Sequence, residues 1–277
     1  MLYRVVMIGR TDPRRTVYRS GINYELDLRE GIDLAIYLFG RFQRHVTDGS
    51  GYSLPVDGTA IDVGANSGTL TLRFAQQALH GVVHAFEPAH SAFRALTRNV
   101  ELNPELGKRI VCHQAFVADV CADDSNLTAF SSWRVDGVDD ARHPIHGGSS
   151  IPADGVPSIT IDSFCVSRGI ESVDLIKIDT EGYEWDVLVG AIGTITRFRP
   201  HVIFEVGGHV LEERGLCFDH FLAFFTELEY ELVDSADRRS ITYDNFTRRV
   251  PRRSTIDVMA IPSEHRRLVD LGEIPER

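Results

Sequence analysis

Apolar and polar positions alternate in a regular way along the chain from residue 58 onwards. Short apolar segments are followed by longer segments in which apolar residues recur every three or four positions. This alternation predicts an α/β fold, in which a parallel sheet is covered on both faces by helices. The predicted core strands are TAIDVGA, GVVHAFEP, RIVCHQAFV, VDLIKID and HVIFEVG, which begin at residues 59, 81, 109, 173 and 201. The predicted helices are SGTLTLRFAQQAL, SAFRALTRNVELN, EWDVLVGAIGTI and FDHFLAFFTELEY, which begin at residues 67, 91, 184 and 218.

The segments outside this core alternation are less regular. In residues 1–55, YRVVMIG and YELDL are predicted strands, and GIDLAIYLFGRF is a predicted helix. Residues 120–157 hold many Asp, Ser, Gly and Pro residues and weak strand runs such as LTAFSSW. So long an irregular insertion in a compact domain indicates a functional or mobile segment. SITIDSFCVSRG then predicts a short strand and a helix, and YELVDS and STIDVMAIP are expected to complete the sheet as an antiparallel pair.

Composition narrows the classes of protein to consider. The chain has 277 residues, 43% of them hydrophobic, which suits one large domain or one domain with an added segment. A formal charge of −11 disfavours nucleic acid as a partner, because an acidic surface repels phosphate backbones. The four cysteines form no CxxC pair, which argues against a zinc site. No apolar run suits a membrane span and no signal peptide is evident, so we expect a cytoplasmic protein.

The sequence IDVGANSG, residues 61–68, places a carboxylate and two glycines where a predicted strand passes into a helix. Ligands bind at this point of a parallel sheet, since the loops there open a crevice and the helix amino terminus offers N–H donors. Gly64 and Gly68 allow close backbone approach and unusual backbone angles. The loop is not a P-loop, because no Gly-Lys-Ser/Thr follows Gly68, and its glycine spacing is not the dinucleotide GxGxxG.

A second acidic residue, Glu87, ends the next predicted strand. A carboxylate there can accept two hydrogen bonds from a ribose diol, so loop and acid together indicate a nucleoside-containing ligand such as NAD or S-adenosylmethionine (SAM). Asp62 favours SAM, because a carboxylate attracts its amino and sulfonium groups and would repel a pyrophosphate. A nucleotide-linked oxidoreductase and a non-catalytic SAM-binding subunit are the alternatives to a methyl-transferring enzyme.

Three blocks of the sequence resemble the FkbM family of SAM-dependent methyltransferases. They are DVGANSGTLTLRFA, VHAFEP and VDLIKIDTEGYEWDVLVGA, and the KIDxEGxE core of the third is the most specific. YELDLREGIDLAIYLFGRF and STIDVMAIP resemble the family's lead-in and closing strand. The resemblance implies the class I methyltransferase (Rossmann-like) fold, with a mostly parallel seven-stranded sheet, and usually O-methylation of a hydroxyl. Family substrates include polyketide-type natural products and the sugars of glycolipids or glycans, so the implied partner is a small-molecule or glycoside acceptor.

The resemblance also implies a cofactor site. The glycine loop would hold the methionyl end of SAM, Glu87 the ribose, and residues near Ala115 the adenine. The implied set is Asp62, Gly64, Ala65, Asn66, Gly68, Glu87, Pro88, Ala115 and Asp119. We expect the methyltransferase domain over residues 56–277, preceded by a segment over residues 1–55 that forms a wall or cap of the substrate site. The sequence carries no indication of the oligomeric state.

Lys177 lies in a predicted strand that should be buried on both faces, and a lysine is almost never fully buried without a partner. Alternation along the strand puts Lys177 and Asp179 on the same face. In the usual strand order, this strand lies between the strand that ends at Asp62 and the strand that carries Glu205. We therefore predict a cluster of Lys177 with Asp62, Asp179 or Glu205 at the carboxyl edge of the sheet.

Methyl transfer to an alcohol also needs a base that removes the hydroxyl proton. The candidate catalytic residues are Lys177, Asp179, Glu181, Glu184, Glu205 and His209. Glu181 and Glu184 would share one face of a helix that begins at Thr180. Structural explanations stay open for each of them: an ion pair for Lys177, favourable charge at a helix amino terminus for the two glutamates, and a loop position for His209.

Two further possibilities concern ligands other than SAM. Asp179, Glu181 and Glu205 supply oxygen atoms that suit Mg²⁺, although their spacing matches no standard metal motif and a metal is not favoured. The insertion is either an exposed turn or a lid over the acceptor, and its candidate residues are His143, His146, Ser149 and Ser150. The amino-terminal segment could form another wall of the site with Tyr18, Tyr24 and Tyr37.

Overall fold

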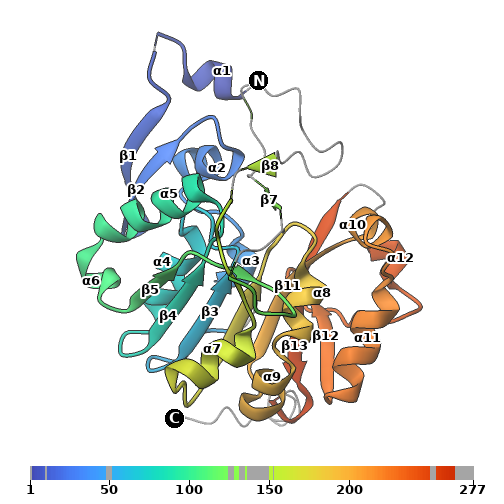
Figure 1. Cartoon of the computed structure of the whole chain (residues 1–277). Helices are drawn as coiled ribbons and strands as arrows, with labels where there is room; N and C mark the ends of the chain where they lie inside the picture. The colour runs from blue at the N-terminus through green and yellow to red at the C-terminus, as the bar shows by residue number, and fades with distance from the viewer. Residues whose placement is uncertain are drawn as a thin grey trace.

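The computed structural model describes residues 2–9, 11–47, 52–123, 128–130, 135, 150–151, 153–249 and 254–265. These residues form a seven-stranded sheet with helices on both faces, together with three two-stranded sheets (Figure 1). In spatial order, the strands of the large sheet are β12 (Tyr230–Asp234), β13 (Thr255–Pro262), β11 (His201–Gly207), β10 (Leu175–Ile178), β3 (Thr59–Val63), β4 (Val82–Phe86) and β5 (Ile110–His113).

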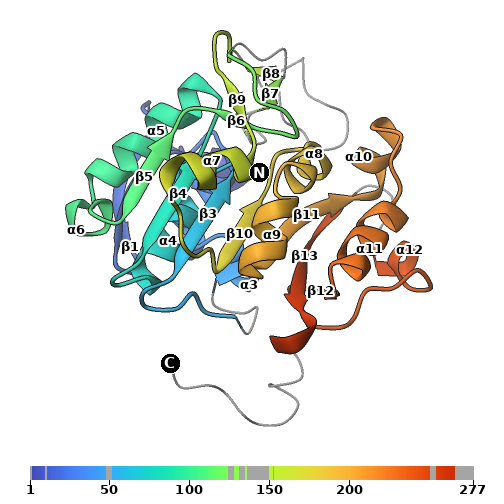
Figure 2. The same ribbon diagram turned by 60° about the horizontal axis from the view of Figure 1, so that its bottom comes forward.

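The order of these strands is that of the class I methyltransferase fold. Strands β3, β4, β5, β10 and β11 are parallel, and β13 runs antiparallel to both β11 and β12. The predicted antiparallel closing pair and the predicted place of β10 between β3 and β11 are therefore confirmed (Figure 2). The chain runs outward from β3 to β5 and then returns to β10 on the other side of β3. This reversal is the topological switch point, where a crevice opens at the carboxyl ends of the strands.

The helices predicted after residue 58 are present among the described residues. They are α4 (Thr69–Gln77), α5 (His90–Glu101), α7 (Ile161–Arg168), α8 (Glu184–Val189), α9 (Ile192–Phe198) and α11 (Phe218–Glu227). Three short helices that the sequence did not predict are α6 (Pro104–Gly107), α10 (Gly208–Glu213) and α12 (Phe246–Arg249). The segment predicted as one helix from residue 184 is divided into α8 and α9 near Gly190. The backbone of Gly190 packs closely against another segment, so that a Cβ atom on this residue would lie 2.1 Å from the Ala118 carbonyl oxygen. No described helix combines the length and the apolar character that a membrane span requires.

Alternate residues of the strands enter two hydrophobic cores on opposite faces of the sheet. Ile61 and Phe204 pack on the face that α7, α8, α9 and α11 cover. Ala60 and Ile203 pack on the other face, with residues of α4 and of the amino-terminal elements. Side chains two positions apart in a strand lie on the same face of the sheet. Asp62 therefore lies on the face of Ala60, which the amino-terminal elements cover, and Lys177, its neighbour in register on β10, lies on the same face.

The amino-terminal segment forms α1 (Leu2–Val6), β1 (Arg14–Arg19), β2 (Ile22–Asp27), α2 (Gly31–Phe39) and α3 (Arg44–Thr47). The strand predicted for YELDL and the helix predicted from Gly31 are confirmed. The strand predicted for YRVVMIG is wrong, because this segment begins with α1. Tyr3, Val6 and Met7 pack against the core at the three- and four-residue spacing of a helix, which a short apolar run does not distinguish from a strand.

The predicted strand RIVCHQAFV is interrupted after His113. Phe116–Val117 forms β6, which pairs in parallel with β9 (Ser158–Ile159) outside the large sheet. β7 (Ala129–Phe130) and β8 (Ser150–Ile151) form an antiparallel pair, which Figure 1 shows above the large sheet. The residues His143, His146 and Ser149 of the insertion lie outside the described residues.

Candidate functional site

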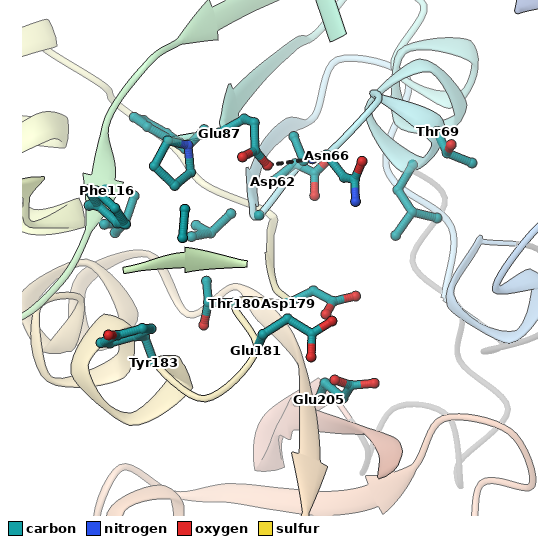
Figure 3. Close-up of a pocket in the computed structure, with 18 of the residues that line it drawn as sticks. Asp62, Asn66, Thr69, Glu87, Phe116, Asp179, Thr180, Glu181, Tyr183 and Glu205 are labelled. Carbon is teal, nitrogen blue, oxygen red and sulfur yellow. Dashed lines mark hydrogen bonds between the residues drawn. The ribbon is translucent and has the colours of Figure 1, made fainter. Parts of the chain in front are cut away.

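An open cleft of about 1120 Å³, including the solvent at its mouth, lies at the carboxyl ends of β3, β4, β10 and β11 (Figure 3). The cleft brings together most of the predicted site residues. Those that line it are Asp62, Gly64, Ala65, Asn66, Glu87, Pro88, Ala115, Asp179, Glu181 and Glu205.

The glycine loop forms one wall of the cleft and has an unusual backbone. Gly64, Asn66 and Gly68 have φ angles of 78°, 51° and 84°. Gly64 is required at its position, because an added Cβ would lie 1.8 Å from the carbonyl oxygen of Asp179 at the end of β10. Close approach of β3 and β10 therefore explains the first glycine of the motif.

Two buried carboxylates lie next to the loop, Asp62 within β3 and Glu87 directly after β4. Asp62 accepts a 2.6 Å hydrogen bond from the Thr71 hydroxyl, and burial raises the pKa of its carboxyl to about 6. Glu87 accepts one backbone hydrogen bond at each oxygen, from the N–H groups of Asn66 and Ala89, both at 2.9 Å. Burial raises the pKa of Glu87 to about 7. Burial and mutual repulsion make it unfavourable for both carboxylates to be ionised. A ligand with a positive charge and hydrogen-bond donors would offset this cost, so the site suits such a ligand.

Lys177 forms the predicted cluster directly below the cleft. Its side chain is 0% exposed, and its Nζ lies 3.2 Å from Asp179 Oδ2 and 3.6 Å from Asp257 Oδ1. Burial lowers the pKa of Lys177, but the carboxylates of Asp179 and Asp257 outweigh burial and raise it above its ordinary value. Asp257 was not predicted, although an aspartate inside the apolar strand STIDVMAIP carries the same kind of signal as Lys177.

Two side chains from the amino-terminal segment complete this network. Gln43 donates a 3.3 Å hydrogen bond from Nε2 to Asp179 Oδ2. His45 in α3 places Nε2 2.6 Å from Asp257 Oδ2. The network therefore joins three parts of the chain that are far apart in sequence, and it holds Asp179 from two sides.

The prediction that Glu181 and Glu184 share one helix face is wrong, because α8 begins at Glu184. The preceding residues form a turn in which Glu181 has a φ of 55°. Glu184 folds back and accepts hydrogen bonds from Thr180 and Gly182, so that it stabilises the turn. Glu181 lines the cleft instead.

Glu181 lies beside Asp179 and Glu205, and in Figure 3 the three carboxylates point to the same side of the cleft. Burial, together with the carboxylates of Asp179 and Glu184, raises the pKa of Glu181 to about 8. Burial and the carboxylates of Asp179 and Glu181 raise the pKa of Glu205 well above its ordinary value, although Glu205 accepts a 2.7 Å hydrogen bond from Thr255. The acidic side of the cleft therefore holds protons at neutral pH that ordinary surface carboxylates would lose.

Besides Glu184, four predicted site residues lie away from the cleft lining that the described residues form. Gly68 caps α4 and packs against Leu96, and Lys177 lies below Asp179. Asp119 is exposed after β6, and His209 is buried within α10. The adenine-side residue Ala115 does reach the cleft, because the strand is interrupted after His113.

The amino-terminal segment contributes Ile32, Phe42 and Gln43 to the lining, and none of these was predicted. The three tyrosines that we expected in this wall are not among the described lining residues. Tyr24 is buried in the core, whereas Tyr18 is 65% exposed. Gln43 carries no sequence signal that would have identified it.

Within the described ranges, no group of three or more His, Cys, Asp or Glu side chains is arranged to hold a metal ion. The carboxylates of Asp179, Glu181 and Glu205 share one side of the cleft without forming such a group. We therefore derive no metal chemistry from them.

Comparison with known proteins identifies one family. The family described as the FkbM methyltransferase domain matches residues 62–232, which is more than half of the chain. No curated protein matches the sequence significantly.

Several solved structures are similar to this chain. The FkbM methyltransferase of Methylobacillus flagellatus KT has 14% identity and a TM-score of 0.47, with 79% of this chain and 48% of that chain covered. A putative transferase of Pyrococcus horikoshii has 14% identity and a TM-score of 0.45, with coverages of 91% and 71%. The M. jannaschii protein TYW2, solved in complex with AdoMet, has 12% identity and a TM-score of 0.42, with coverages of 90% and 86%. The chain spans about half the length of the Methylobacillus protein.

Proposed function

The chain belongs to the FkbM methyltransferase family, and from this premise we propose that it transfers a methyl group from SAM to a hydroxyl of a small-molecule natural product or of a sugar in a glycoside. SAM-dependent methyl transfer is the activity of the family. The transfer to oxygen and the class of acceptor are our proposal. The observation that carries it is that Asp179, Glu181 and Glu205 line the same cleft as Asp62 and Glu87.

The chemistry of the cleft fits SAM. Asp62 can attract the positive charge of the methionyl end, and each Glu87 oxygen has a lone pair beyond its backbone hydrogen bond with which to accept from the ribose hydroxyls. Apolar side chains beyond Glu87 suit the adenine ring, and they are Phe86, Pro88, Ala115, Phe116 and Val117. We therefore propose that the cofactor binds on the β3–β4 side of the cleft and the acceptor on the β10–β11 side.

When bound, SAM supplies a methyl group that its sulfonium makes electrophilic. The chain then has to orient the acceptor hydroxyl, exclude water and take the hydroxyl proton. We assign the last task to Glu181, because a base is most effective when its pKa lies near the working pH. Asp179, which Lys177 and Gln43 hold in place, would orient the acceptor.

The same side chains restrict the acceptor. The described lining residues include no lysine or arginine that could bind a phosphate or a carboxylate of an acceptor, whereas the acidic side chains can form hydrogen bonds with hydroxyl groups. Phe42 and Tyr183 add aromatic surface to the lining. A neutral acceptor with several hydroxyl groups, such as a sugar residue, fits this environment.

Replacement of Glu87 by alanine tests the cofactor side of the proposal. We expect SAM to bind less tightly by about 1–3 kcal/mol, because charge-assisted hydrogen bonds to the ribose are lost. The measurement is calorimetric titration of SAM into each variant. Because Glu87 also holds the N–H groups of Asn66 and Ala89, Glu87→Gln is the matched control, and it should retain part of the affinity. An unchanged affinity in Glu87→Ala would contradict the ribose assignment.

The acceptor is tested by incubating the protein with SAM labelled in its methyl group and with fractionated cell extract, followed by identification of the labelled product. We expect the label on an oxygen atom of a neutral hydroxylated compound. Label on nitrogen or carbon would refute O-methylation. If SAM binds but no fraction is labelled, the chain is better described as a non-catalytic SAM-binding subunit.

A further inference from the structure

The amino-terminal strand β2 is bound along an edge by side chains rather than by another strand. β2 pairs with β1 through one of its edges. At the other edge, three side chains accept its backbone N–H groups: Asn103 Oδ1 accepts from Asn23 at 2.8 Å, Asn99 Oδ1 from Glu25 at 2.7 Å and Asp33 Oδ2 from Asp27 at 2.7 Å. Every second N–H of the strand is therefore satisfied by a side chain from α2 or from the end of α5 and its following residues.

Two of these three side chains also reach Ser67 in the glycine loop. Asn99 donates a 2.9 Å hydrogen bond from Nδ2 to the Ser67 carbonyl oxygen. The Ser67 hydroxyl lies 3.4 Å from Asp33 Oδ1. Asn99 is 0% exposed and Asp33 is 6% exposed, so both connections are inside the protein. Asn103 binds the same edge of β2, but its amide donates to the carbonyl oxygens of Asn23 and Asn99 rather than to the loop.

The glycine loop needs such support. Residues on both sides of Ser67 have positive φ angles, and Asn66 adopts this conformation although it is not a glycine. The Asn66 N–H has to point at Glu87 to make its 2.9 Å hydrogen bond. An unfavourable backbone conformation of this kind is kept only when contacts with the rest of the protein stabilise it. In this loop, Ser67 is the residue that makes those contacts.

We propose that Asn99 is a positioning residue of the cofactor site, which together with Asp33 ties Ser67 to the edge of β2 and so sets the shape of the loop. The proposal rests on the placement of SAM against this loop under the proposed function. If the proposal is correct, residues 22–33 help to shape the cofactor site, although they precede residues 62–232, which match the family.

The test compares Asn99→Asp with Asn103→Asp. Asn99→Asp keeps an oxygen to accept from Glu25 but replaces the donor to Ser67 with an oxygen. We expect it to raise the Kd for SAM about tenfold, the effect of one lost buried hydrogen bond, with kcat at saturating SAM close to that of the wild type. Asn103→Asp removes the donor to the carbonyl oxygens of Asn23 and Asn99 but leaves the hydrogen bond from Asn99 to Ser67 in place, so we expect a lower Tm but a Kd for SAM within about twofold of the wild type.

Hydrogen exchange of the SAM-free protein supplies a readout that does not depend on activity. We expect the Asn66 amide to exchange faster in Asn99→Asp and to be unchanged in Asn103→Asp. Equal effects of the two variants on the Kd and on exchange, or no effect of Asn99→Asp, would overturn the proposal. If Asn99→Asp does not fold, Asp33→Ala tests the same connection with the same expected direction. A wild-type protein that does not bind SAM would instead refute the proposed function, while the exchange comparison still decides whether Asn99 holds the loop.

Discussion

Replacement of Lys177 by methionine is expected to lower the free energy of unfolding by about 3–5 kcal/mol, because it removes one partner of a buried ion pair. Methionine fills a similar volume but leaves Asp179 and Asp257 without the charge that compensates them. Asp257 has a 6% exposed side chain, so water cannot replace the lost partner there. We expect SAM binding to fall as well, since Asp179 forms part of the cleft. Urea unfolding and calorimetric SAM titration measure the two effects.

Lys108 is the other lysine of the chain and serves as the control. Its ion pair with Glu105 is 2.8 Å long, but the two side chains are 67% and 81% exposed. Lys108→Met should therefore leave stability and SAM affinity unchanged. Lys177→Met with wild-type stability and wild-type SAM affinity would rule out the importance of the cluster.

The pH dependence of the Lys177 effect has a definite sign. Lys177 has a raised pKa in the folded protein, so it stabilises the fold at neutral pH and below. Lys177 and His45 lower the pKa of Asp257 despite its burial, so the contribution of Asp257 is present at neutral pH and is lost as the pH falls through that carboxyl's titration. The stability gap between wild type and Lys177→Met should therefore be full at neutral pH and narrow in acid.

Replacement of Glu181 by glutamine is expected to lower kcat by a factor of about 10²–10⁴, which is the usual contribution of a general base. The KM for SAM should change little, because Glu181 lies on the acceptor side of the cleft. In the wild type, kcat should rise with pH through about 8, since the pKa of Glu181 is raised and the base acts in its ionised form. The variant should lack this rise. Rates of methyl transfer from labelled SAM at a series of pH values measure both effects.

Glu171, an exposed residue before β10, supplies the matched control for Glu181. Glu171→Gln makes the same chemical change away from the cleft, and we expect its pH–rate profile to match that of the wild type. If Glu181→Gln retains the wild-type kcat and its rise with pH, Glu181 is not the base. Loss of the rise in Glu205→Gln instead would transfer that role to Glu205.

The elements of the large sheet could be predicted from the sequence because their signals are local. An apolar run such as VDLIKID and the helical spacing of FDHFLAFFTELEY depend on a few neighbouring residues. The loop from Gly64 to Gly68 was identified for the same reason, since glycines directly after a predicted strand indicate a turn with unusual backbone angles or close backbone approach. Asp62 and Glu87 were found because a strand end is itself a local feature.

The failures are of a different kind. The segment YRVVMIG was predicted as a strand because a short apolar run fits either period, and its contact with the core decided for a helix. Glu181 was placed on a helix because its spacing to Glu184 suits one, whereas hydrogen bonds from Thr180 and Gly182 to Glu184 stabilise a turn instead. In both cases contacts in three dimensions outweighed the local pattern.

The class of fold, the strand ends at which a cofactor would bind and the need of Lys177 for acidic partners could all be inferred from local patterns of residues. Which acids are the partners of Lys177, and which side chains hold them, depends on how distant elements pack together. His45 meets Asp257 across 212 positions of sequence, and Glu25 meets Asn99 across 74. The physical reason is that a strand or helix follows from the chemistry of adjacent residues, whereas the partner of a buried polar group depends on which elements pack against each other.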